Sequence, residues 1–291
     1  MPYVSPAVAL LLGIFIAQLT GHPYMNLNNR ATHLLLQISV VGLGFGMNLQ
    51  HAIEAGKEGI LFTVFSILGT LIIGFFLGKW LIIDRKTSFL ISCGTAVCGG
   101  SAIAAISPII NAEEKQISVS LGCIFILNSI ALYVFPLIGH QLNLSQTQFG
   151  LWCAIAIHDT SSVVGASSRY GVHALEVATT VKLARALWII PIAFLSTSLF
   201  KNQNKKITVP YFIGLFIVAM ICNSYIPFIT KISPYITQLS KIGLSLTLFL
   251  IGAGLSRKVV RSVGMKPLFQ SVILWLLISG AALYAVLQLS N

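Results

Sequence analysis

The chain contains apolar runs that are too long for the core of a soluble domain, and one of them reads GILFTVFSILGTLIIGFFLG over residues 59–78. A helix needs about 20 apolar residues to cross a hydrocarbon layer of ~30 Å. Only helices and closed barrels satisfy their backbone polar groups inside such a layer. Barrel strands show alternating segments of about 10 residues rather than unbroken runs. The sequence therefore predicts an all-α, polytopic membrane bundle.

The composition agrees with this fold class. Of the 291 residues, 56% are hydrophobic and 9% are charged, whereas ordinary soluble domains contain about 25% charged residues. Lysine and arginine outnumber acidic residues by 18 to 7, which in a membrane protein indicates topology rather than nucleic-acid binding. The five cysteines lie in or near apolar segments without metal-type spacing, and we interpret them as buried hydrophobic residues.

Ten transmembrane spans are predicted, joined by short loops within a single domain over residues 1–291. The spans cover residues 4–20, 31–49, 58–80, 87–110, 115–138, 147–169, 174–200, 209–225, 234–255 and 266–288.

The distribution of basic residues tests this topology. Loops on one side contain 11 basic residues and loops on the other contain 4, with Lys182, Arg185 and Lys241 inside spans. The positive-inside rule then places both termini outside the cell membrane. If residues 147–169 formed a re-entrant segment, every later loop would change sides. The loops on the two sides would then contain 9 and 6 basic residues, which is a weaker asymmetry. A crossing segment is therefore the preferred interpretation.

A weak internal repeat relates the two ends of the chain. LGIFIA (12–17) is similar to IGLFIV (213–218), and GFGMNL (44–49) is similar to LIGAGL (250–255). Inverted repeats of this kind are common in secondary transporters, although apolar segments match easily by chance.

The fourth predicted span contains Cys98-Gly99-Gly100-Ser101 about 12 residues from its basic end, which is roughly 18 Å into the membrane. Paired glycines permit left-handed backbone angles, and Ser101 can cap a new helix. We predict a discontinuous helix here. The alternative is close helix packing at small residues.

The sixth predicted span has five consecutive polar residues at a similar depth, within CAIAIHDTSSVVG (153–165). They are His158, Asp159, Thr160, Ser161 and Ser162. An ionised aspartate in hydrocarbon costs roughly 3 kcal/mol on insertion scales, so Asp159 requires a polar cavity or a partner. The next three residues can cap a second half-helix. The alternatives are a structural pairing of Asp159 with His158 or a lysine, and an external loop.

Both interruptions would place the N-terminus of a half-helix near the middle of the membrane, where its N–H groups and dipole favour anions. Lys182 and Arg185 lie three residues apart on one helical face. They either face an anionic substrate or Asp159, or reach the outer surface. Pro191 is expected to kink their helix. Asn128 is a buried amide that either binds substrate or joins helices.

Five stretches resemble the sulfate exporter family, the YeiH-type conserved bacterial inner-membrane proteins. They are VCGGSAIAAISPIINAEEKQISVS (97–120), IHDTSSVVGAS (157–167), KLARALWIIPIAFL (182–195), ITVPYFIGLFIVAMICNS (207–224) and GMKPL (264–268). The resemblance covers nearly the whole chain. The family often has glutamate where this chain has the shorter Asp159, and fuller members have an extra N-terminal helix.

This resemblance implies a fold similar to the bile acid/arsenite/riboflavin transporter superfamily and to sodium–proton antiporters, with a mobile core domain that moves against a panel. It implies a substrate or ion site formed by Cys98 to Ser101, His158 to Ser162, and Lys182 with Arg185.

The preferred function is a secondary active transporter that exports a small anion, such as sulfate or an organosulfonate, by alternating access, with H⁺ or Na⁺ as coupling ion. The alternative is a sodium- or proton-coupled cation antiporter that uses Asp159 as ion carrier. An enzyme is not expected, because no G-x-S-x-G or H-E-x-x-H motif occurs. We expect no metal or organic cofactor. The expected partners are a small anionic solute and the lipid bilayer. Nucleic acid is not expected, and the sequence leaves open whether the protein forms a homodimer.

Overall fold

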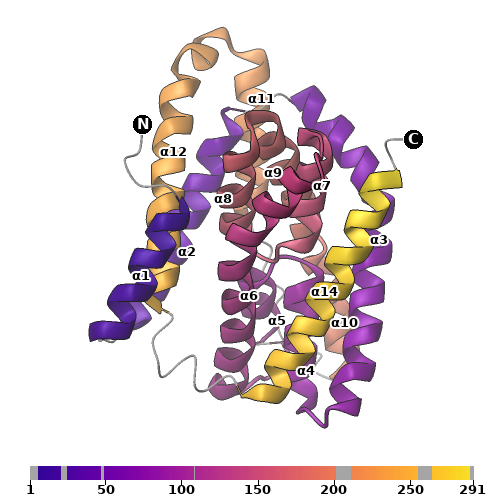
Figure 1. Cartoon of the computed structure of the whole chain (residues 1–291). Coiled ribbons are helices and arrows are strands. Elements are labelled where there is room, and N and C mark those ends of the chain that lie inside the picture. The colour runs from indigo at the N-terminus through magenta and orange to yellow at the C-terminus, as the bar shows by residue number, and fades with distance from the viewer. Residues whose placement is uncertain are drawn as a thin grey trace. The chain divides into compact units, whose positions relative to one another are not determined.

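The computed structural model describes residues 6–20, 25–46, 49–107, 109–200, 211–254 and 264–288, and this part of the chain is helical without β-strands. The predicted single membrane domain contains two compact units. The first unit combines Met1–Lys57 with Pro210–Arg257, and the second combines Glu58–Val209 with Lys258–Asn291. Figure 1 labels their helices.

The first unit contains α1 (Pro6–Thr20), α2 (Met25–Gly44), α11 (Tyr211–Tyr225), α12 (Pro227–Gly254) and the beginning of α3 (Leu49–Trp80). Helix α12 packs against α1 and α2, and α11 packs against α2. Glycines bring the backbones of α1 and α12 close together. A Cβ atom at Gly13 would lie 2.8 Å from Ala253 N, and one at Gly252 would lie 2.9 Å from Ile14 N. Small residues allow this close packing within membranes.

The second unit contains the rest of α3 and eight further described helices. They are α4 (Arg85–Ala96), α5 (Gly100–Ile106), α6 (Glu114–Gln141), α7 (Gln146–Ala156), α8 (Thr160–Tyr170), α9 (Val172–Ala186), α10 (Ile189–Leu199) and α14 (Met265–Gln288). Its core includes Ile91 of α4, Cys123 of α6 and Leu274 of α14.

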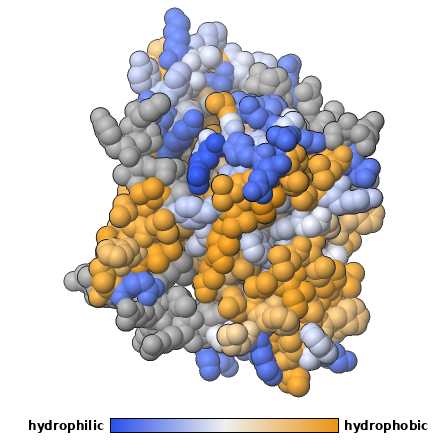
Figure 2. All heavy atoms as spheres, in the orientation of Figure 1, coloured by the Kyte–Doolittle hydropathy of each residue, from blue (hydrophilic) through white to orange (hydrophobic). Residues whose placement is uncertain are grey.

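Five helical segments in the described part of the chain are long and apolar enough to cross a membrane. They are Thr63–Trp80, Lys115–Gln141, Val172–Leu199, Pro227–Gly254 and Met265–Gln288. Val8–Leu19 and Gly214–Tyr225 form shorter apolar helices. Figure 2 shows broad areas of hydrophobic side chains on the surface. The prediction of a helical, multi-pass membrane protein is confirmed.

Residues 85–112, here called the first hairpin, enter the second unit and return to the same end. Helix α4 leads inward, and α5 with the following turns leads back. Lys86 Nζ donates a hydrogen bond to Asn111 O at 2.7 Å. Gln116 Nε2, at the start of α6, donates to Asp84 Oδ2 at 2.8 Å. The beginning of α4 therefore lies beside the beginning of α6.

Residues 146–170, here called the second hairpin, do the same at the opposite end of α6. Gln146 Oε1, at the start of α7, accepts hydrogen bonds from His173 N at 3.0 Å and Ala174 N at 3.2 Å, at the start of α9. Tyr170, the last residue of α8, donates its hydroxyl to Leu144 O at 2.6 Å. In Figure 1, α4 and α5 lie in one half of this unit and α7 and α8 in the other.

These contacts correct the topology of two predicted spans. Residues 87–110 and 147–169 were expected to cross the membrane, but each segment begins and ends at one end of the second unit. The two interruptions themselves are confirmed. Apolarity and length indicate that a segment enters a membrane, but the direction of the chain after a break depends on contacts between residues far apart in sequence.

The segment predicted to kink at Pro191 is interrupted shortly before the proline. Helix α9 ends at Ala186 and α10 begins at Ile189. Leu187 N and Trp188 N bond to the carbonyls three residues earlier, at Ala184 and Arg185. Proline cannot donate to the carbonyl four residues before it, and its ring crowds that group. The tighter turn accommodates this effect.

Candidate functional site

The tips of the two hairpins meet beside α6. Gly99 is the tip of the first hairpin and has a left-handed φ of 61°. A Cβ atom at this position would lie 3.4 Å from Asp159 Cβ and 3.3 Å from the carbonyl carbon of His158, in the second tip. Gly99 N also bonds to Gly94 O at 2.8 Å, which closes the end of α4.

Asn128 of α6 fixes the second tip. Its Nδ2 atom donates to Asp159 Oδ2 at 2.7 Å, and its Oδ1 atom accepts from His158 N at 3.0 Å. Asn128 is buried with 2% of its surface exposed. The sequence left its role open between substrate binding and helix association, and in this conformation its amide joins α6 to the hairpin.

Asp159 caps α8. Its carboxylate accepts bonds from Ser162 N at 2.6 Å, Ser162 Oγ at 3.0 Å and Ser161 Oγ at 2.8 Å, besides the bond from Asn128. We expected Thr160, Ser161 and Ser162 to cap this helix, and Asp159 does so instead. A carboxylate at a helix N-terminus interacts favourably with the dipole. The positive end of α8 therefore already holds an anion from the chain itself.

Lys182 and Arg185, one turn apart on α9, bind the carbonyl ends of the two inward-leading helices. Lys182 Nζ donates to Ile157 O at 2.7 Å and Ala154 O at 3.2 Å, at the end of α7. Arg185 donates to Ala96 O, at the end of α4. Cations are favoured at helix C-termini. Both side chains are fully buried, so neither reaches the outer surface.

Arg185 also connects the site to α3, because Nη1 donates to Ser66 Oγ at 2.9 Å. Neither Lys182 nor Arg185 forms an ion pair with a carboxylate of the described residues, where the ion pair found joins His173 to Glu176. Asp159 instead bonds to neutral donors. The buried charges therefore lie close together without pairing directly.

Several buried polar atoms near the tips have no hydrogen-bond partner among the described residues. They are Thr95 Oγ1, both ring nitrogens of His158, and Arg185 Nε. Such groups are costly to bury, at about 1–3 kcal/mol each. We call the charged and polar residues at the hairpin tips, together with Gly99, the tip cluster. It consists of Thr95, Gly99, Asn128, His158, Asp159, Lys182 and Arg185.

The remaining predicted site residues lie around the tip cluster. Cys98 is buried beside Gly99, and Gly100 and Ser101 are half-buried in the first turn of α5. We expected Ser101 to cap this helix, but its N-cap is Gly99 and no side chain caps it. Thr160 is buried at the start of α8. The structure therefore brings all twelve predicted residues to one region of the second unit.

Sequence reasoning missed Thr95 and Ser66, as well as the carbonyls that bind Lys182 and Arg185. The signal for Thr95 was available, since it is a polar residue in an apolar stretch shortly before Cys98. Backbone carbonyls carry no such signal. Among the described residues, no group of three or more His, Cys, Asp or Glu side chains is placed to hold a metal ion.

The apolar helices, the hairpins and the buried charges define a multi-pass helical membrane protein. The family described as Conserved hypothetical protein 698 matches residues 3–271, and the chain belongs to this family. It is 55% identical to a UPF0324 membrane protein of Bacteroides thetaiotaomicron over 279 residues, which cover 95% of this chain and 84% of the relative.

Two further relatives are also UPF0324 membrane proteins. A UPF0324 membrane protein of Porphyromonas gingivalis is 49% identical over 289 residues, or 98% of this chain and 88% of the relative. One of Photobacterium profundum is 50% identical over 287 residues, or 99% of this chain and 88% of the relative. No solved structure matches the chain.

Proposed function

We propose that the protein is a secondary active transporter of a small anion, such as sulfate or an organosulfonate, and that the anion binds at the tip cluster. A buried excess of positive charge carries this proposal. Lys182 and Arg185 are buried, and Asp159 is the one buried acidic residue among the described residues. Unpaired buried charge is costly. A bound anion would therefore lower the free energy of this region.

Unused hydrogen-bonding groups support the same ligand class. Arg185 Nε and the Thr95 hydroxyl are donors without partners in the described residues, and His158 offers a ring N–H. Asp159 uses its carboxylate on Asn128 and two serines. The anion would bind on the Thr95 and Arg185 side of the cluster, away from that carboxylate.

The two hairpins support an inverted-repeat mechanism. Each hairpin is followed by one long helical segment, α6 after the first and α9 with α10 after the second. Each repeat consists of a hairpin and the long segment that follows it. Because α6 crosses the membrane once between the two hairpins, the second repeat is inverted relative to the first. CGGS (98–101) and HDTS (158–161) then occupy equivalent positions, 60 residues apart. Secondary transporters bind substrates between discontinuous helices of this kind, and each hairpin would open the site to one side.

The similarity between residues 12–49 and 213–255 belongs to the same proposal. Its four segments lie in α1, α2, α11 and α12 and just beyond their ends. In the first unit, α1 packs on α12 and α11 packs on α2. Exchanging the two halves of the repeat exchanges these contacts, which supports a pseudo-twofold relation.

We propose a topology of eight crossing segments and two hairpins, with the basic side in the cytoplasm and both termini outside a bacterial inner membrane. It assigns 12 basic residues to one side and 3 to the other, a sharper division than the predicted 11 to 4. The first group is Arg30, Lys79, Arg85, Lys86, Lys115, Lys201, Lys205, Lys206, Arg257, Lys258, Arg261 and Lys266. The second group is Lys57, Arg169 and Lys231.

The test is uptake of labelled sulfate, and separately of a labelled alkanesulfonate, by proteoliposomes of the purified full chain loaded with the unlabelled anion. We expect exchange that Lys182→Met lowers at least tenfold and Lys182→Arg partly retains. Lys241→Met is the matched control, because Lys241 lies in α12 of the first unit, whereas the tip cluster belongs to the second unit.

Lack of exchange with both anions and with related small anions would overturn the proposal. The cation antiporter would be selected instead by an inward sodium or proton flux with two properties. This flux would be lost in Asp159→Asn, and no anion would change it. An equal loss in Lys241→Met and Lys182→Met would assign the effect to general damage.

A further inference from the structure

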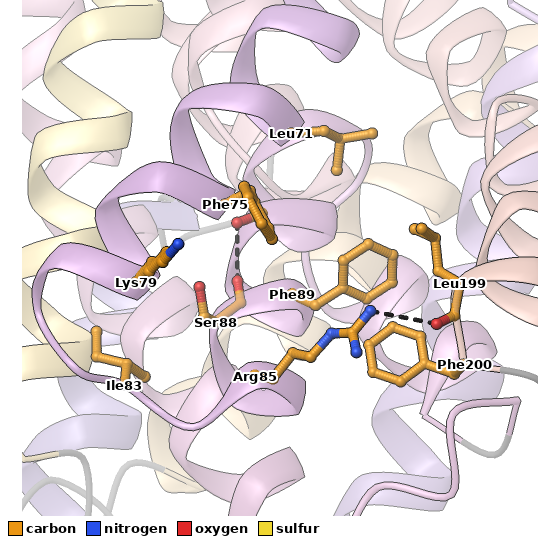
Figure 3. A pocket seen from close by; sticks show the side chains of 11 residues that line it. Leu71, Phe75, Lys79, Ile83, Arg85, Ser88, Phe89, Leu199 and Phe200 are labelled. Atoms are coloured by element: carbon orange, nitrogen blue, oxygen red, sulfur yellow. Dashed lines mark hydrogen bonds between the residues drawn. The ribbon is translucent and has the colours of Figure 1, made fainter.

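A partly open cavity of about 280 Å³ lies at the opposite end of the first hairpin from its tip. It is bordered by the last turns of α3, the start of α4 and the end of α10. Its walls are largely apolar, with Leu71, Phe75, Phe89 and Leu199 among them (Figure 3). None of the tip-cluster residues lines it. The proposed anion transport therefore does not account for this cavity.

Two cations line this apolar cavity. Arg85 Nη2 donates to Leu199 O at 3.2 Å, and its guanidinium lies over the Phe200 ring, 4.8 Å from the centroid. Figure 3 shows this guanidinium between the aromatic rings, with Lys79 on the other side of the cavity. These contacts fix the Arg85 charge in position and leave most of its five N–H donors unused.

No carboxylate of the described residues neutralises these cations. Asp84 precedes Arg85, but its carboxylate accepts from Thr87 N, from Thr87 Oγ1 and from Gln116. Lys79 and Arg85 are both exposed. The cavity therefore combines an apolar interior with uncompensated positive charge at its edge.

The surface beside the cavity is suited to lipid. Ile72, Phe76 and Trp80 on the same part of α3 expose 57%, 63% and 71% of their surfaces. Exposed apolar side chains on a transmembrane helix face acyl chains, and tryptophan is enriched at the level of the headgroups. Lys79 and Arg85 also belong to the side with 12 basic residues in the proposed topology.

We propose that this cavity binds an anionic phospholipid from the cytoplasmic leaflet. The phosphate lies between Lys79 and Arg85, and an acyl chain lies along Leu71, Phe75 and Leu199. Basic pockets between transmembrane helices on the cytoplasmic side have the charge and position that anionic lipid headgroups require. A bound lipid would join α3, α4 and α10, and would thereby support the base of the first hairpin.

The test measures the melting temperature of the purified full chain in detergent with phosphatidylglycerol, phosphatidylcholine or inorganic phosphate added. Native mass spectrometry counts the lipids that remain bound. We expect phosphatidylglycerol alone to raise the melting temperature by several degrees. Lys79→Gln should remove at least half of that shift without disturbing the contacts of Arg85, and Lys79→Gln with Arg85→Gln should remove nearly all of it.

Arg169→Gln is the matched control, because Arg169 is an exposed arginine over the Tyr133 ring at 5.9 Å, far from this cavity in the fold. It should keep the full shift. Equal stabilisation by phosphatidylcholine, an equal effect of phosphate alone, or an equal loss in Arg169→Gln would overturn the proposal. Because the readouts are lipid binding and stability, their failure is distinct from a failure of anion transport.

Discussion

The buried charges of the second unit interact with helix ends rather than with one another. Lys182 binds the carbonyl end of α7, Arg185 binds that of α4, and Asp159 binds the N–H end of α8. Each charge is thus stabilised by a backbone dipole and by hydrogen bonds in a buried region. The cluster contains two cationic side chains and one carboxylate, and neither cation is paired directly with that carboxylate.

Asp159→Ala tests the buried cap. The carboxylate accepts four hydrogen bonds in a buried position, so we expect a loss of about 3 kcal/mol of stability, seen as a large fall in melting temperature. Ser145→Ala removes the exposed cap of α7, whose Oγ accepts from Gln148 N at 3.2 Å, and should cost only about 1 kcal/mol. Equal losses would contradict a special role for the buried carboxylate.

Each hairpin depends on local chemistry at its break. In the first, Gly99 adopts a left-handed conformation and ends α4. In the second, Ile157 and Asp159 are extended, and the Asp159 carboxylate starts α8. The same change of direction is thus produced by backbone freedom in one hairpin and by side-chain capping in the other.

The adjacent glycines of the first tip provide a matched pair of variants. Gly99→Ala should destabilise the protein by about 1–2 kcal/mol, because alanine disfavours φ of 61° and its Cβ would lie 3.1 Å from Ile124. Gly100→Ala meets side chains at an ordinary 3.5 Å and should be neutral or stabilising by up to about 1 kcal/mol. Thermal unfolding in detergent measures both. The reverse order would show that the break does not require Gly99.

The hairpins predict which loops share a side of the membrane. Ile83→Cys and Glu113→Cys should react with an impermeant maleimide from one side, and Leu142→Cys and Val172→Cys from the other. All four variants are made in a background without the native cysteines, and intact and inverted vesicles are labelled in parallel. If Ile83→Cys and Glu113→Cys reacted from opposite sides, the first hairpin would have to cross the membrane.

For the whole molecule, the basic residues predict orientation. Because positive loops remain in the cytoplasm, alkaline phosphatase fused after Asn291 should be active in the periplasm, and a green fluorescent protein fused there should be dark. Fusions within 201–206 should give the opposite pattern. Identical behaviour at the two positions would contradict the proposed topology.

The positions of several helices agree closely with those predicted from the sequence. The predicted spans 115–138 and 266–288 correspond to α6 and α14, each within a few residues. Helix α3 begins earlier than the predicted residue 58, at Leu49, because its first turns contain Glu54, Lys57 and Glu58 and are helical without being apolar. Hydrophobicity therefore marks the membrane-embedded part of a helix and not its full length.

The tip cluster could be predicted in part for a similar reason. Ionisable residues are costly in apolar segments, and this rule identifies His158, Asp159, Lys182 and Arg185 as candidate site residues. The partners of these residues could not be predicted. The carbonyls of Ile157 and Ala96 belong to residues without polar side chains, and they become available only because helices end there.

The sequence by itself determined the class of protein, the positions of both breaks and the identity of the buried charges, since these depend on the solvation of each segment and on local backbone preferences. Only the tertiary structure decided that the chain turns back after each break, and that the two tips meet beside Asn128. That outcome depends on contacts such as Gln146 with His173 and Lys86 with Asn111. These join residues more than twenty positions apart, whose approach no local pattern specifies.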